Sequence, residues 1–193
     1  PALVSDVVTT PIGEVKPGPT LVPIITWGGD IATILANGNS LTTTKGSIFE
    51  SQGLNIKLNL EDVFSNQLSR YRSGESPYLR GTVAQIGLAL EFLNQDPRTK
   101  PIAIYQMTWS RGGDCLVVKA GINTAADLKG KTIVLQAYGP HLDYLARILS
   151  DAGVNISEVK IRYVKDLTGS DESPDAAFRS ADVDAVFVVS PDA

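Results

Sequence analysis

The chain has 193 residues, of which 43% are hydrophobic and 20% are charged, with a formal net charge of -4. Such a chain can bury a sizeable core, and its acidic balance argues against nucleic acid or an anionic membrane surface as the main partner. Its single cysteine excludes an intramolecular disulfide, and its single histidine argues against a zinc site, so no metal and no cofactor are expected.

The N-terminal segment, residues 1–21, is rich in proline, threonine and valine. This composition predicts an extended arm or linker. The segment has no charged stretch followed by an apolar one, so we expect either a cytoplasmic protein or one whose signal peptide has been removed. No apolar run in the chain approaches the ~20 residues that span a bilayer, so direct membrane insertion is not expected.

From residue 22 onward, strand patterns and helix patterns alternate. Apolar or alternating runs predict strands at 22–27, 53–60, 102–109, 115–119, 131–136, 159–164 and 184–189. Amphipathic runs and capping residues predict helices at 31–37, 61–73, 81–95, 125–128, after residue 140 and around 174–180. Strands separated by helices of this length imply parallel βαβ units, so the predicted fold class is α/β, with mostly parallel sheets flanked by helices.

For two of these helices the sequence allows more detailed predictions. Asp30 is positioned to cap the helix at 31–37. In the helix at 81–95, a buried stripe is predicted from apolar residues at helical spacing, namely Val83, Ile86, Leu90 and Leu93.

The two tryptophans of the chain lie in similar surroundings. TWGGD at 26–30 is echoed by TWSRGGD at 108–114, and each follows a predicted strand. A tryptophan that fills a core edge beside a Gly-Gly turn is one interpretation. The other is a cleft in which aromatic surface and bare backbone meet a small ligand, with contacts from Trp27, Gly28, Gly29, Asp30, Trp109 and Arg111.

The segment at 136–141, QAYGPH, is a second candidate binding region. Ligands of open parallel sheets bind beyond the carboxyl ends of the strands. Glycine and proline at a helix start leave N–H groups at the positive end of the helix, where a carboxylate, phosphate or sulfonate binds without lysine. Candidates here are Gln136, Tyr138, Gly139 and His141, with Ser190 at another strand end. The alternative is an ordinary turn, with His141 on the surface.

The segment at 74–82, GESPYLRGT, links two predicted helices where a strand would be expected. Its composition is typical of a mobile surface loop. Alternatively it lines the cleft through Ser76, Tyr78 and Arg80, with the arginine as an anion partner. The sequence contains no Ser-His-Asp order, phosphate-binding loop or dinucleotide motif, so no catalytic residue is assigned.

Several segments together resemble periplasmic solute-binding proteins of the type II class. ADLKGKTIVLQAYGPHLDYLARILSDAGV at 126–154 resembles the opening of the second lobe, and VDAVFVVSPDA at 183–193 resembles a later strand of that lobe. TWGGDIATILANG and GSIFESQGLNIKL resemble segments of the first lobe. The most similar group serves ABC transporters and binds nitrate, sulfonates, taurine or pyrimidine precursors.

This resemblance covers 22–193 and implies lobe 1 at 22–110 and lobe 2 at 111–193. The second lobe is expected to be incomplete, because the family continues past the strand near the end of this chain. SGESPYLRGTV at 73–83 departs from the family pattern and leaves the ligand class open.

The implied function is capture of a small polar or anionic ligand between two lobes by hinge closure, without enzymatic activity. The implied partner is an ABC transporter permease. The implied location is periplasmic or extracellular, including anchoring as a lipoprotein. The alternatives are an enzyme on the same fold, similar to pyrimidine synthases, a ligand-sensing regulatory domain, or an interaction module.

Overall fold

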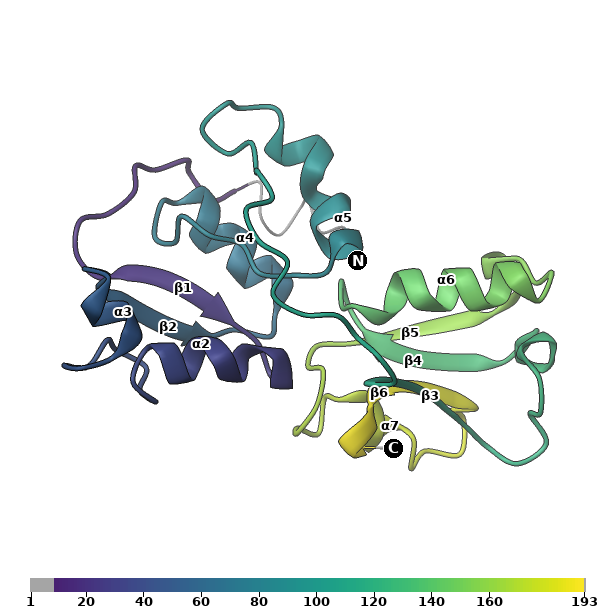
Figure 1. The fold of residues 1–193 in the computed structure, drawn as a ribbon. Coiled ribbons are helices and arrows are strands. Elements are labelled where there is room, and N and C mark those ends of the chain that lie inside the picture. Colours follow the sequence, from purple (N-terminus) through teal and green to yellow (C-terminus); the bar gives the residue numbers. More distant parts are fainter. Residues whose placement is uncertain (1–8, 193) are drawn as a thin grey trace. The chain divides into compact units, whose positions relative to one another are not determined.

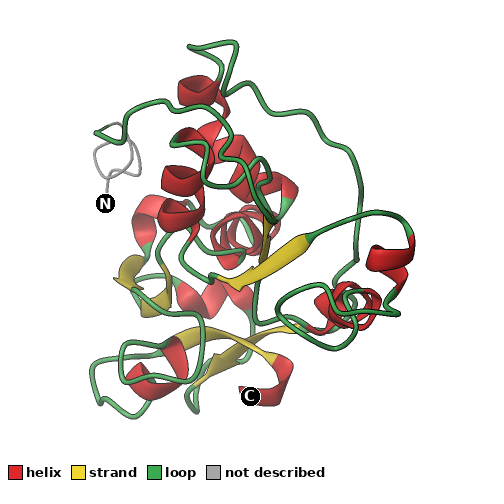
Figure 2. Ribbon diagram, turned by 90° about the vertical axis from the view of Figure 1, so that its left-hand side faces the viewer, coloured by secondary structure: helices red, strands yellow, loops and turns green. Residues whose placement is uncertain are grey.

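The computed structural model describes residues 9–192. The chain divides into two compact units, of which unit 1 ends at Trp109 and unit 2 begins at Ser110. Both units combine short strands and helices with long irregular connections (Figure 2). Residues 1–8 of the predicted N-terminal arm lie outside the described residues.

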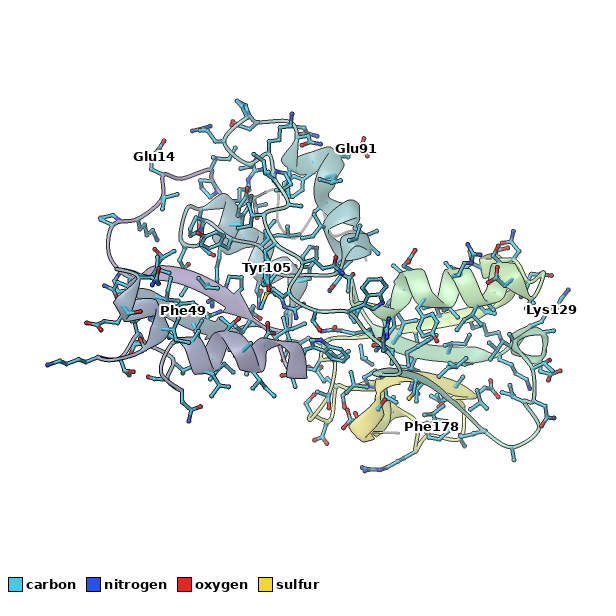
Figure 3. All side chains as sticks on the ribbon, in the orientation of Figure 1. Glu14, Phe49, Glu91, Tyr105, Lys129 and Phe178 are labelled. Carbon is cyan, nitrogen blue, oxygen red and sulfur yellow. The ribbon has the colours of Figure 1, made fainter. Side chains whose placement is uncertain are left out.

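Unit 1 is built around two parallel strands (Figure 1). Its elements are β1 (Thr20–Ile24), the 3-10 turn η1 (Gly28–Asp30), α2 (Ile31–Ala36), α3 (Ile48–Ser51), β2 (Ile56–Leu60), α4 (Phe64–Arg72) and α5 (Val83–Leu93). Alternation along β2 buries Ile56 and Leu58, which form a small core with Ile24. Phe49 of α3 packs against this core (Figure 3).

Unit 2 contains a four-stranded sheet in the order β3-β6-β4-β5. Its elements are β3 (Asp114–Val118), η2 (Ala125–Leu128), β4 (Thr132–Gln136), α6 (His141–Asp151), η3 (Ile156–Glu158), β5 (Lys160–Val164), α7 (Pro174–Ala177), β6 (Ala185–Val189) and η4 (Ser190–Asp192). β4 pairs in parallel with both β5 and β6, whereas β3 is antiparallel to β6. The predicted α/β class, with mostly parallel sheets flanked by helices, is confirmed.

The central strands of unit 2, β4 and β6, are buried on both faces. Successive side chains of a strand point to opposite faces, so Ile133 of β4 packs with Leu145 of α6, while its neighbour Val134 packs on the other side with Phe178, next to α7. The two helices accordingly lie on opposite faces of the sheet (Figure 1). This double coverage explains why β4 and β6 are nearly continuous apolar runs, whereas the edge strand β5 keeps exposed residues.

The predicted strand at 102–109 is wrong. Residues 101–110 form neither helix nor strand, and Ile102 and Tyr105 expose 81% and 79% of their surface (Figure 3). Apolar, β-branched residues fit a pleated sheet, but a strand also needs a hydrogen-bonded neighbour. Within residues 9–192, no strand pairs with this segment.

The predicted buried stripe of α5 is also wrong. Leu93 is fully buried, but Val83 exposes 91% and Leu90 exposes 38% of its surface. The other buried side chains of α5 are Gln85, Ala89 and Phe92. Because this helix is apolar on most sides, the spacing of its apolar residues does not select which face is buried.

The corrected face of α5 is testable with two identical substitutions. Leu93→Ala is expected to lower the free energy of unfolding by about 2–5 kcal/mol, because it leaves a cavity in a closed environment. Leu90→Ala removes the same atoms from a partly exposed site and is expected to cost about 1 kcal/mol or less. Urea unfolding followed by circular dichroism measures both, and equal losses would contradict the assigned face.

Candidate functional site

The two Thr-Trp sequences, at 26–27 and 108–109, lie in contact within unit 1. The indole Nε1 of Trp27 donates a long hydrogen bond of 3.4 Å to the Thr108 hydroxyl. A Cβ added to Gly29 would lie only 2.6 Å from the Thr108 side chain, whereas a Cβ added to Gly28 would meet no atom within 4 Å. The second glycine of the pair is therefore required by the close approach of Thr108. Trp109, next along the chain, exposes 69% of its surface.

Two carboxylates shape the turn that follows β1. Asp62 accepts from both the backbone N–H and the hydroxyl of Thr26, each at 2.7 Å, and Asp30 accepts from the N–H of Ile25 at 3.0 Å. These bonds take the N–H groups that would continue the strand, so β1 ends at Ile24 rather than at Trp27 as predicted. The predicted capping of α2 by Asp30 is wrong as well, because its side chain makes no capping hydrogen bond.

Asp30 instead forms a buried ion pair with Arg80. The guanidinium Nε lies 3.3 Å from Asp30 Oδ1, and the side chains expose only 11% (Arg80) and 2% (Asp30) of their surface. The two partners are 50 residues apart in sequence. The structure thus brings together two residues that the sequence assigned separately, one to the Gly-Gly-Asp turn and one to the 74–82 segment.

Ser76 and Tyr78 lie on the same irregular connection between α4 and α5. The buried Ser76 hydroxyl lies 3.0 Å from the Leu21 carbonyl and 2.9 Å from the Tyr78 carbonyl, and it accepts from the Tyr78 N–H at 3.2 Å. Its role in the structure is therefore to hold this connection against β1. The Tyr78 side chain is 39% exposed.

In unit 2, Asp114 joins the beginning of β3 to the beginning of α6. Its Oδ1 lies 2.8 Å from Nε2 of His141, and its Oδ2 accepts from the Ser110 hydroxyl. His141 is 1% exposed, and its ring stacks on Phe187 with the centroids 5.3 Å apart, which corrects the alternative that placed it on the surface. The hydrogen bond from His141, helped by the one from Ser110 and opposed by burial, holds the pKa of the Asp114 carboxyl below its ordinary value.

The turn between β4 and α6 is tightly built. Gln136 is 2% exposed and donates to the Lys165 carbonyl at 3.1 Å, and a Cβ on Gly139 would lie 2.7 Å from the Gln136 side-chain oxygen. Tyr138 adopts a left-handed φ of 57°, which is uncommon for a bulky residue. Pro140, at the N-cap of α6, makes no side-chain capping bond, so its side chain satisfies none of the N–H groups at the helix start.

Ser190 and Arg111 complete the predicted residues of unit 2. The Ser190 hydroxyl donates to the Gly112 carbonyl at 2.5 Å, and its N–H donates to the Gly113 carbonyl at 2.9 Å. Ser190 thereby ties the end of β6 to the glycines that precede β3. Arg111 is exposed on the same loop.

Three further residues of these clusters were not singled out from the sequence: Thr108, Asp62 and Asp114. The sequence could have identified Asp114, because it ends the second Gly-Gly-Asp in the way that Asp30 ends the first. It could also have identified Asp62, since it follows the carboxyl end of β2, where polar groups gather in parallel sheets. For Thr108 the sequence offered only its place in the repeated Thr-Trp sequence.

Residues 9–192 contain neither a metal-binding cluster nor a helix that could span a membrane. No group of three or more histidine, cysteine, aspartate or glutamate side chains in this range could hold a metal ion. In the same range, no helix combines the length and the apolar character needed to cross a membrane.

No protein-family model matches the sequence, and no curated protein matches it with significance. Solved structures do match. The chain resembles the periplasmic aliphatic sulphonate binding protein SsuA from Escherichia coli, with a TM-score of 0.57 and 19% identity, over 91% of this chain and 56% of that one. It also resembles the alkanesulfonate-binding protein SsuA from Xanthomonas axonopodis pv. citri bound to MOPS, with a TM-score of 0.60 and 17% identity, over 92% and 56%.

A protein from Bordetella bronchiseptica RB50 matches with a TM-score of 0.52 and 16% identity, over 90% of this chain and 52% of that one. At these identities the likeness is one of fold. The chain shares the fold of two binding proteins over about nine-tenths of its own length, and it spans little more than half of theirs.

The contact between Gly29 and Thr108 predicts different effects for the two adjacent glycines. Gly29→Ala is expected to lower the free energy of unfolding by about 1–3 kcal/mol, because the new Cβ overlaps the Thr108 side chain. Gly28→Ala meets open space, so it is expected to be neutral or to stabilise by up to about 1 kcal/mol. Thermal unfolding distinguishes them, and a harmless Gly29→Ala would rule out the close approach.

The Asp114 carboxyl is expected to titrate below its ordinary value of about 3.9. A lowered folded-state pKa stabilises the protein above the ordinary pKa, and this contribution is lost as the pH falls through the folded-state pKa. The advantage of the wild type over Asp114→Asn in urea unfolding should therefore be present at about pH 6 and decline at about pH 3.

Carboxyl ¹³C NMR tests the cause directly. His141→Asn removes the largest cause and should raise the Asp114 pKa more than Ser110→Ala does. An unchanged pKa in His141→Asn would show that the imidazole does not lower it.

Proposed function

We propose that this protein is an extracytoplasmic solute-binding protein, which captures a small polar or anionic molecule and delivers it to an ABC transporter permease. The observation that carries the proposal is the fold shared with two sulfonate-binding proteins over about nine-tenths of the chain. One of those proteins is bound to MOPS, a sulfonate with a morpholine ring. The ligand proposed here is accordingly a small molecule with a sulfonate or a similar oxyanion.

The turn before α6 supports the proposal from unit 2. The N-terminus of this eleven-residue helix carries partial positive charge, which stabilises an anion. Tyr138 is held in a strained backbone conformation directly before it, and such strain is concentrated at binding sites. We assign ligand contacts in this unit to the loops at the strand ends, through Arg111, Gln136, Tyr138, Gly139, His141 and Ser190. His141, whose side chain is buried, would contribute its backbone N–H.

The corner after β1 supports the proposal from unit 1. Trp27 is partly buried and held by Thr108, so its indole offers a fixed apolar surface for a ligand to stack on. Trp109 and Tyr78 are exposed aromatic side chains of the same unit. We assign ligand contacts here to Trp27, Gly28, Gly29, Asp30, Ser76, Tyr78, Arg80 and Trp109.

The proposal includes the absence of enzymatic activity. A hydrolase or synthase needs a nucleophile or an acid–base group that can reach substrate. The single histidine is buried, and its Nε2 is held by Asp114. The similar structures named above with a stated role are described as binding proteins.

Tryptophan fluorescence and differential scanning calorimetry test the function. The protein is titrated with MOPS, taurine, nitrate, phosphonates, phosphate, pyrimidines and amino acids. One class should change the emission saturably, and Trp27→Phe or Trp109→Phe should diminish that change. The same compound should raise Tm, because a ligand at 100 times its Kd stabilises the folded state by about 2.7 kcal/mol.

A matched pair of tyrosine variants tests the turn before α6. Tyr138→Asn keeps a residue that tolerates the left-handed conformation, so the fold should persist while affinity drops at least about tenfold, or 1.4 kcal/mol. Tyr163→Asn, on the edge strand β5, should bind like the wild type. If no compound of the panel changes either emission or Tm, the proposed function is wrong.

A further inference from the structure

Two nitrogens of the Arg80 guanidinium have different surroundings. Nε faces Asp30 Oδ1 at 3.3 Å. Nη2 is buried and has no hydrogen-bond partner within residues 9–192. An arginine with one nitrogen paired and another buried without a partner is unusual, since buried polar groups nearly always have a hydrogen bond.

Asp30 is already occupied on both of its oxygens. Oδ1 faces Nε of Arg80, and Oδ2 accepts from the N–H of Ile25 at 3.0 Å. The aspartate therefore fixes the position of the guanidinium without forming a hydrogen bond to Nη2. A buried donor on a charged group has lost its water and gained nothing in return, so an acceptor atom placed there would bind favourably.

From this geometry we propose that the Nη edge of Arg80 binds an oxyanion of the ligand, and that Asp30 acts as a positioning residue. The inference rests on the proposed function and names the recognised group. The N–H of Asp30 bonds to the Trp27 carbonyl at 3.0 Å, so the aspartate that pairs with Arg80 lies on the same short turn as Trp27. The matching ligand carries a sulfonate, phosphonate or carboxylate on a compact apolar body.

Arginine meets both demands at this position better than lysine. Its planar guanidinium spreads its donors over Nε and the two Nη atoms, so Nε serves Asp30 while Nη2 serves an oxyanion. A lysine carries all its donors on one nitrogen, which Asp30 would hold close to its own carboxylate. Because the aspartate offsets the charge of the arginine, directed hydrogen bonds rather than net charge recognise the ligand.

Arg80 lies on a segment without regular secondary structure. The side chain retains 11% of its exposed surface, and it lies on the 73–82 connection, which contains neither helix nor strand. Binding requires a rearrangement of this connection large enough to admit one oxygen atom to Nη2. The ion pair with Asp30 need not break, because it uses Nε and not Nη2.

The test compares Arg80→Lys with Arg98→Lys by calorimetric titration with MOPS. Arg98 belongs to the same unit and pairs with Asp96, but its side chain is 56% exposed, so it is a matched control. Arg80→Lys should keep its ion pair and its fold yet lose at least about tenfold in affinity, whereas Arg98→Lys should bind normally. An uncharged analogue, 3-morpholinopropanol, should bind both variants with equal affinity.

A second measurement uses the wild-type protein and does not depend on the variant folding. ¹⁵N NMR follows the Arg80 Nη and Nε resonances during titration with methanesulfonate. The Nη signal should shift and the Nε signal should stay nearly constant.

The outcomes distinguish the oxyanion site at Arg80 from the proposed transport function. If the wild type binds MOPS and Arg80→Lys binds it equally well, the inference fails and the proposed function stands. A shift at Nη together with no binding of any panel compound would sustain the anion site and refute the transport role. If the Nη signal does not shift and no panel compound binds, both the inference and the proposed function are wrong.

Discussion

Each Gly-Gly-Asp sequence of this protein ends in a carboxylate that a side chain from a distant segment holds in place. Asp30 pairs with Arg80, 50 residues further along, and Asp114 pairs with His141, 27 residues further along. In unit 1 this pair joins the turn after β1 to the connection before α5, and in unit 2 it joins the start of β3 to the start of α6. Each pair thus ties one candidate binding loop to another segment of its own unit.

Such pairs determine position more than they add stability. Removing a charge from water is costly, and a buried pair recovers that cost only with good geometry and further hydrogen bonds. Asp30 gains such a bond from Ile25, and Asp114 gains one from Ser110. In unit 1 the same bond withdraws an N–H group from the strand, so β1 ends early and Trp27 lies on a turn beside Thr108. The carboxylate thus sets the shape of the corner as well as its charge.

How far sequence predicts this structure depends on where each element finds its partners. β4, β5, β6 and α6 were predicted within about two residues of their positions in the structure. For β4 and β6 the reason is that both faces of the strand are buried, so the apolar pattern records that burial. The segment at 102–109 is also largely apolar, but no strand among residues 9–192 pairs with it. The pairing of Asp30 with Arg80 could not be predicted, because the local sequence favours Asp30 as a helix cap. The burial of His141 could not be predicted either, because it depends on Phe187 from β6.

The Asp30–Arg80 and Asp114–His141 pairs differ in the hydrogen-bonding groups that they leave available. The ionised carboxylate of Asp114 only accepts, so Nε2 of His141 carries the proton, and in the neutral ring Nδ1 is an acceptor that cannot bind an oxyanion. Arginine has no such restriction, because every nitrogen of its guanidinium is a donor. Pairing with Asp30 therefore leaves Arg80 able to donate to a second acceptor, whereas Nδ1 of His141 donates only when the ring is protonated. We therefore propose Arg80 as a side-chain donor to an oxyanion in unit 1, and the backbone N–H groups at the start of α6 as donors in unit 2.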